Sequence, residues 1–282
     1  MAASVDTTGA KIGTAIQVPD LAITELQTIT AFGLGDNAGD YLFTLDELQD
    51  VTLSQAEEST EITGRGGRRL ATLKQNKTVT ISGTSGLYSA GLLELQTGGN
   101  FARSTTATVK RTEYLPVVRN TVTLNYTPSG AIDAVYVRDE SGIVSKVLTV
   151  TSASTVSTGN YKINAGSSST PTTLTLAEAD AASSVIVVYN STVTGNVLTN
   201  DSGTFAQKAA LYIDALAEDK CANTYRVQIY IPKADFSGEF DIALGGDQTV
   251  QAFSAEALAG SFCGADATAG TLWTWTVFTD AA

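Results

Sequence analysis

The sequence predicts a mainly β protein, with one helix that packs on a sheet and an inserted small all-β module of the Ig-like or barrel kind. Segments rich in Thr, Val and Ile alternate with turns that contain Gly and Asn, a pattern that favours strands over helices. In the middle of the chain, short apolar runs recur about every ten residues, the spacing of a small sandwich or barrel. The 282 residues are 43% hydrophobic and only 16% charged, so a large core is expected and disorder is not.

The first part of the chain is expected to form strands after a weakly structured leader over residues 1–20. Residues 23–36 leave the choice between helix and strand open, although 28–32 has strand character. Residues 51–54 and 78–86 alternate between apolar and polar side chains, as half-buried strands do. These segments are predicted to belong to one core sheet.

The clearest helix is predicted over residues 84–98 and should pack on a sheet. Thr84 and Ser85 are both candidates for its N-cap, and Gly98 with Gly99 would end it. Its apolar stripe consists of Leu87, Tyr88, Leu92 and Leu95.

The middle of the chain changes in character and is predicted to be an insertion. Residues 105–116 have strand character, and 117–203 contain the short, weakly charged strands described above. Strong strand patterns then return, over 208–216, 224–233 and 271–279. We therefore expect a core made of residues 1–116 and 204–282, interrupted by a β module over 117–203.

Several residue types are missing or scarce, and this excludes many kinds of chemistry. The chain has no His, which removes the commonest general base and the usual transition-metal ligand. Its two cysteines, Cys221 and Cys263, are too few for a disulfide framework or a four-thiolate metal site, and they either pair or stay apart. We expect no enzyme, no cofactor and no metal. No stretch approaches the roughly 20 apolar residues of a membrane span, and the start lacks a signal-peptide pattern, so we expect a soluble product made in a cytoplasm.

The net charge of −12 is distributed in blocks along the chain. Residues 1–64 hold one base against eleven acids, whereas residues 65–119 hold nine bases against two acids. Such segregation can bring identical copies together head to tail, an acidic surface of one meeting a basic surface of the next. The alternative is a run of solvated charges.

A long arm separates the two alternating segments of the first part. Residues 59–77 combine Gly64, Gly66 and Gly67 with many charges, and we expect a long loop that becomes ordered against a neighbour, because a simple hairpin would not need this length. The candidate contact residues on and beside it are Glu57, Glu58, Glu61, Arg65, Arg68, Arg69, Lys74 and Lys77.

Other motifs give weaker indications. Paired carboxylates such as Asp46 and Glu47 can hydrolyse glycosides, but only with a geometry that sequence spacing does not show. The turn that holds Asp36 and Asp40 lacks the alternation and closing Glu of a calcium loop, so a plain polar turn is favoured. Trp273 and Trp275 would share one face of a strand as core or subunit-contact residues, with carbohydrate stacking as the alternative.

Two segments resemble a known family. Residues 48–98, with the arm and the predicted helix, are similar to the N-terminal part of tail tube proteins, the major tail proteins of long-tailed bacteriophages. Residues 221–259, followed by LWTWTVF, resemble the closing strands of the same proteins. Together the two segments cover about half of the chain, and the resemblance is one of pattern, without an invariant catalytic motif.

The resemblance implies a structural protein of the virion tail, whose core is a β-sandwich or β-barrel with one flanking helix. Six copies would form a ring, and stacked rings would form the tube through which DNA leaves the capsid without sequence-specific binding. The partners would be further copies of the chain and other tail proteins such as the tape measure, tail terminator and baseplate. The arm over residues 59–77 would reach the adjacent ring, where Arg65, Arg68 and Arg69 would meet acids such as Asp50 or Glu57 of another copy. Acidic residues on the lumen would repel DNA phosphates.

Rival functions remain open. A capsid decoration protein, or another virion surface protein, would share the composition but has less use for a basic arm complementary to an acidic block. A glycan hydrolase of the virion would need one of the paired carboxylates for turnover. The inserted module would decorate the tube, bind carbohydrate or a cell surface, or belong to the tube wall.

Overall fold

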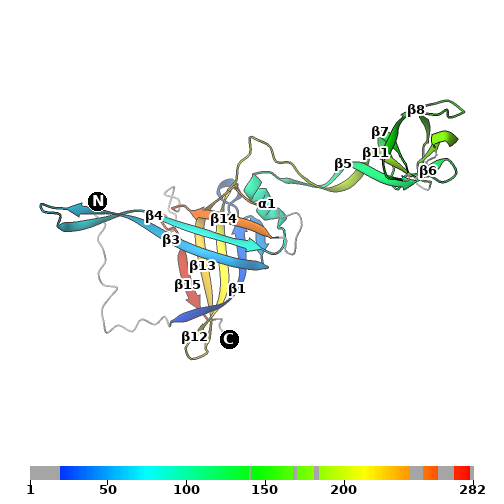
Figure 1. Cartoon of the computed structure of the whole chain (residues 1–282). Coiled ribbons are helices and arrows are strands. Elements are labelled where there is room, and N and C mark those ends of the chain that lie inside the picture. Colours follow the sequence, from blue (N-terminus) through cyan, green and yellow to red (C-terminus); the bar gives the residue numbers. More distant parts are fainter. Residues whose placement is uncertain are drawn as a thin grey trace. The chain divides into compact units, whose positions relative to one another are not determined.

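The computed structural model describes residues 20–139, 141–167, 170–180, 184–241, 250–259 and 270–279. The protein is mainly β, with two sheets and a single α-helix in these residues, which confirms the predicted fold class. The chain divides into two compact units, shown in Figure 1: the first comprises Met1–Asn100 with Thr199–Ala282, and the second comprises Phe101–Leu198. Apart from Asp20, the predicted leader lies outside the described residues.

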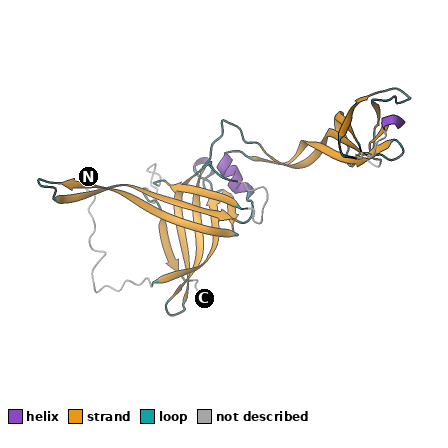
Figure 2. Cartoon of the chain, viewed as in Figure 1, coloured by secondary structure: helices purple, strands orange, loops and turns teal. Residues whose placement is uncertain are grey.

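The first unit is built on an eight-stranded antiparallel sheet that curls into a half-barrel (Figure 2). Its strand order is β2-β1-β12-β13-β14-β4-β3, and β15 pairs with β13. The strands are β1 (Leu21–Phe32), β2 (Tyr41–Leu45), β3 (Leu48–Thr63), β4 (Arg69–Ser85), β12 (Lys208–Asp219), β13 (Thr224–Phe236), β14 (Gln251–Ala257) and β15 (Thr274–Phe278). The segment whose structure was left open, residues 23–36, thus contributes a strand.

The core of this unit lies on one face of the sheet because apolar residues alternate with polar ones along its strands. Ile29 of β1, together with Leu211 and Ile213 of β12, is buried on that face. Helix α1 (Ala90–Thr97) contributes Leu92 and Leu95 to the same cluster. The helix therefore supplies part of the core through Leu92 and Leu95, whereas Leu87 and Tyr88 of the predicted apolar stripe precede the helix and are exposed.

The helix is shorter than predicted, and neither predicted N-cap is used. Ser85 still belongs to β4, where it pairs with Leu48 and Gln251, so the backbone is extended there. Ser89 caps the helix instead, and its hydroxyl accepts a hydrogen bond from the Leu92 amide at 3.3 Å. At the other end, Gly98 takes the left-handed conformation with a φ of 70°, and the helix stops where predicted.

The second unit is a seven-stranded sheet of order β5-β11-β7-β8-β9-β10-β6. Its strands are β5 (Phe101–Pro116), β6 (Thr121–Thr123), β7 (Pro128–Arg138), β8 (Val144–Val150), β9 (Asn160–Asn164), β10 (Thr173–Leu176) and β11 (Ser184–Leu198). All pairings are antiparallel except that of β8 with β9. The unit has its own core, centred on Leu124, Val187 and Tyr189.

This unit begins earlier in the chain than the boundary of 117 that the sequence suggested. Strand β5 pairs with β11 along its whole length, from Phe101 opposite Leu198 to Pro116 opposite Ser184. Because hydrogen bonds tie all of β5 to β11, residues 101–116 belong with the second unit.

A buried carboxylate ties three segments of the second unit together. Asp180 is 4% exposed; it accepts a hydrogen bond from Lys146 Nζ at 2.6 Å and another from the Gly159 amide. Burial alone would raise the pKa of Asp180, but these two hydrogen bonds and the charge of Lys146 outweigh it, so the pKa lies below the ordinary value of 3.8.

The second unit should therefore lose stability in acid. A carboxyl group whose pKa is depressed by folding stabilises the native state above its unfolded pKa, and this stabilisation disappears as the pH falls through the folded value. Asp180→Asn should lower the free energy of unfolding at pH 7 by about 1–3 kcal/mol, a figure reduced because the Lys146 side chain is 39% exposed. Urea unfolding at pH 7 and pH 3 checks this, and an equal pH dependence in both proteins would contradict it.

Candidate functional site

Strands β3 and β4 continue beyond the body of the first sheet as a two-stranded ribbon (Figure 1). At its base Val79 and Ile81 are buried in the core. Farther out, residues 54–78 are exposed on both faces, except for the half-buried Gly64. The prediction of a loop over residues 59–77 is wrong, because these residues pair as an antiparallel hairpin from Ser59 opposite Lys74 to Thr63 opposite Arg69, with a register shift after Ile62.

The turn at the end of the ribbon explains the glycines of this segment. The Gly64 amide donates to the Arg68 carbonyl at 2.8 Å, and the Gly67 amide donates to the Gly64 carbonyl at 3.1 Å. Gly66 and Gly67 have φ values of 81° and 74°, a region in which side chains with a Cβ are strained. The turn thus needs these glycines and presents Arg65 and Arg68 beside them.

All eight predicted contact residues lie on this ribbon, and several of them pair across it. Glu57, Glu58 and Glu61 are on β3, Arg65 and Arg68 are in the turn, and Arg69, Lys74 and Lys77 are on β4. Glu57 forms an ion pair with Lys74, and the Arg69 guanidinium lies 3.1 Å from Glu61. The carboxylate of Glu58 accepts a hydrogen bond from the side-chain Nδ2 of Asn76 at 2.6 Å.

These cross-strand pairs affect the charge that the ribbon presents. The hydrogen bond and the charge of Lys74 lower the pKa of Glu57 from its ordinary value, so this carboxylate stays ionised in mild acid. Exposed ion pairs add little stability, and their main effect here is to neutralise the acids of the ribbon.

Three cationic side chains on the ribbon form no hydrogen bond or ion pair within the part of the chain that the structure describes, namely those of Arg65, Arg68 and Lys77. Exposed apolar side chains accompany them. Leu70, next to the turn, is 68% exposed, and Leu73 is 52% exposed. A two-stranded ribbon is only marginally stable in water by itself, so unpaired cations beside exposed leucines indicate a binding surface.

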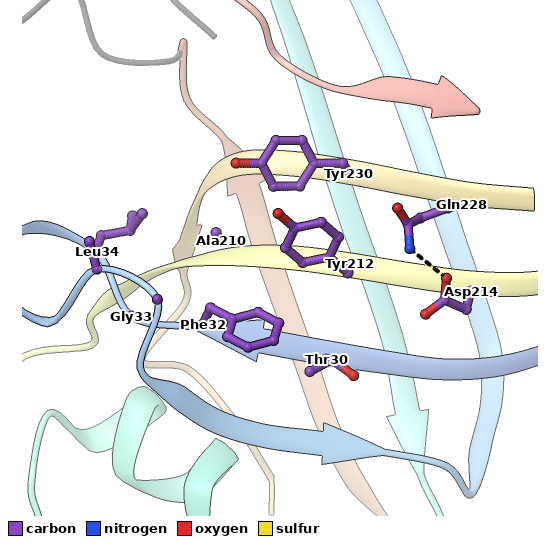
Figure 3. A pocket seen from close by; sticks show the side chains of 11 residues that line it. Thr30, Phe32, Gly33, Leu34, Ala210, Tyr212, Asp214, Gln228 and Tyr230 are labelled. Carbon is purple, nitrogen blue, oxygen red and sulfur yellow. Dashed lines mark hydrogen bonds between the residues drawn. The ribbon is translucent and has the colours of Figure 1, made fainter. Parts of the chain in front are cut away.

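A second feature, which the sequence analysis did not single out, is a groove on the sheet face opposite the core. It has a volume of about 630 Å³ and lies over β1, β12 and β13 (Figure 3). The rings of Tyr212 and Tyr230 are stacked with centroids 4.5 Å apart, and Phe32 meets Tyr212 edge-on at 5.5 Å. Beside them Gln228 donates a hydrogen bond of 2.9 Å to Asp214.

The pairing register assembles this groove. Tyr212 lies opposite Tyr230, and Asp214 opposite Gln228. Strand alternation puts Tyr212 and Asp214 on one face of β12. The partner strand and its register are long-range features that no local pattern in the sequence specifies.

The other candidate sites give little support for chemistry. Among the residues that the structure describes, no three His, Cys, Asp or Glu side chains gather as a metal site. The segment with Asp36 begins as a short 3-10 turn, Gly35–Asn37. Cys221 is exposed, whereas Cys263 lies outside the described residues. No helix in the described ranges is long and apolar enough to cross a membrane.

The two tryptophans near the end of the chain have different environments. Only Trp275 belongs to β15, and Trp273 precedes this strand, so the prediction that both share one face of a strand is wrong. Trp273 packs against the first core and donates a hydrogen bond from Nε1 to the Gln55 side chain at 3.2 Å. Trp275 is 45% exposed, and its ring meets that of Trp273 edge-on at 6.4 Å. Trp273 therefore links the first core to β3 at the point where the ribbon leaves the sheet.

Comparison with known protein families identifies the family of this chain. A model of the YomU/Tube protein family matches residues 26–263, which include nearly all strands of both units. No curated protein matches the chain.

Proposed function

Because the chain belongs to the YomU/Tube protein family, we propose that it is the tail tube subunit of a long-tailed bacteriophage. In this proposal copies of the chain form rings of six, the rings stack into a tube in the virion tail, and DNA passes through the tube during delivery. The function is structural, and no step of it needs a catalytic group or a cofactor.

The observation that carries the proposal is the ribbon formed by β3 and β4. Its residues 54–78 are exposed on both faces, except for half-buried Gly64, and none of them belongs to a core formed by the described residues. A projection of one copy that binds a different surface of the next is a heterologous contact, and such contacts build open stacks. The predicted inter-ring residues, from Glu57 to Lys77, all lie on this projection.

The edges of the first sheet support ring formation. The sheet ends at β2 on one side and at β3 on the other, and an edge strand offers unpaired backbone groups to a neighbour. In the proposed ring, the edges of adjacent copies meet, so the curled sheets together enclose a lumen. The net charge of −12 suits a lumen that DNA passes without binding. Tape measure, terminator and baseplate proteins are the proposed partners at the ends.

Electron microscopy of the purified full chain in negative stain tests this function. At low salt we expect rings or hollow tubes with a lumen wide enough for a DNA duplex. Because charged contacts are screened within about 3 Å at 1 M salt, tubes should shorten or dissociate into rings there. A chain that stays monomeric at every salt concentration, and binds preformed capsids instead, would support a capsid decoration protein and contradict the proposal.

A further inference from the structure

We propose that the groove over β1, β12 and β13 is the receptor for the arginine-bearing turn of a second copy of this chain. The inference rests on the proposed function and deepens it, because it names the surface that the ribbon binds. In each stacking contact, Arg65 or Arg68 of one copy would enter the groove of the next and reach Asp214.

The chemistry of the groove matches a guanidinium group. Asp214 is the one charged side chain among the residues that line it, and no Lys or Arg among the described residues forms an ion pair with this carboxylate. Tyr212 and Tyr230 present aromatic rings close by (Figure 3). A guanidinium both stacks on aromatic faces and pairs with a carboxylate through two parallel hydrogen bonds, which an ammonium cannot do.

The groove is also prepared for such a ligand before it binds. Gln228 fixes the Asp214 carboxylate through a 2.9 Å hydrogen bond, and the stacking of the two tyrosines fixes their rings. The loop at one end of the groove carries Asp36 and Asp40, both exposed, which extend its negative field. Little ordering of the groove's own side chains would accompany binding, and this favours affinity.

The turn of the ribbon has the complementary properties. The acids of the ribbon are occupied by Lys74, Asn76 and Arg69, so Arg65 and Arg68 remain as unpaired positive charges at its end. The glycines between them make the turn slender, and the exposed side chain of Leu70 can cover apolar groove surface. The volume of the groove, about 630 Å³, lies in the range of sites that enclose several such groups.

A second copy must supply the turn. The ribbon runs away from the sheet of its own chain (Figure 1). From Gln55 to Thr63 it extends over about 30 Å, at about 3.3 Å per residue. The turn and the groove are thus far apart on one copy and repeat on every copy, as an open stack requires.

An exchange of charge in the full chain tests the pairing. The variants are Asp214→Arg, Arg65→Asp with Arg68→Asp, and all three changes together. Asp201→Arg is the matched control, since it makes the same change of charge in an exposed loop away from the groove. The readouts are the protein concentration at which tubes appear in sedimentation and the tube length by electron microscopy, with circular dichroism to check the fold.

We expect each of the first two variants to raise the concentration needed for tubes by about tenfold or more, because like charges then face each other. The triple variant should recover assembly at least in part, and Asp201→Arg should assemble normally. If Asp214→Arg does not fold, Asp214→Asn should weaken assembly in the same direction. Normal tubes from the Asp214 variants would overturn the groove as receptor and leave the proposed function intact, whereas absence of tubes from the unaltered chain would overturn both.

Discussion

Replacing residues 57–77 with Asn-Gly should abolish tube formation and leave the first unit folded. Ala56 and Thr78 lie directly opposite each other in the hairpin, so a two-residue turn can join them in register. Apart from half-buried Gly64, every residue removed is exposed, and none belongs to the core. The free energy of unfolding should therefore change by less than about 1 kcal/mol, while the projecting surface is lost completely.

Thermal unfolding and electron microscopy of the shortened chain check both parts of this expectation. A control exchanges the partners of an ion pair away from the ribbon, Lys110→Asp with Asp133→Lys, and should assemble because the ribbon is unchanged. Tubes of normal length from the shortened chain would show that the ribbon is not needed for stacking.

Leu92→Ala should destabilise the first unit by about 2–5 kcal/mol. The Leu92 side chain is fully buried between α1 and the sheet, in the cluster that includes Ile213, so its truncation leaves a cavity in the core. Leu87→Ala is the matched control; Leu87 is 62% exposed, and its truncation should change stability by no more than about 0.5 kcal/mol. Urea unfolding of the two variants measures the difference, and equal effects would contradict the assigned core.

The predictions from the sequence were best where one face of a strand is buried. The alternation in residues 78–86 and 224–233 follows directly from burial on one side, and β4 and β13 confirm it. The ribbon gives no such pattern, because solvent reaches both of its faces and its few apolar side chains, such as Leu70 and Leu73, are exposed. Its glycines and charges therefore resembled those of a loop, although the binding role was inferred from the same residues.

Long-range pairing explains the other differences. The helix begins at Ala90 because Ser85 is held in β4 by partners on β3 and β14, and one of them lies 166 positions away in the chain. The groove depends on three segments, around Phe32, Tyr212 and Tyr230, that only the sheet order brings together. Local propensity predicts neither the start of the helix nor the assembly of the groove, since both arise from tertiary structure.

The pairing of Phe101 with Leu198 makes the second unit a replaceable cassette. The chain leaves the first unit and returns to it at neighbouring positions of one antiparallel strand pair, about 5 Å apart. The first unit needs only that its chain ends at Asn100 and Thr199 stay close together. Any folded domain whose own termini are adjacent meets this requirement. Residues 101–198 can therefore be exchanged, during evolution or by design, for an enzyme, an epitope or a different binding module while the first unit retains its fold.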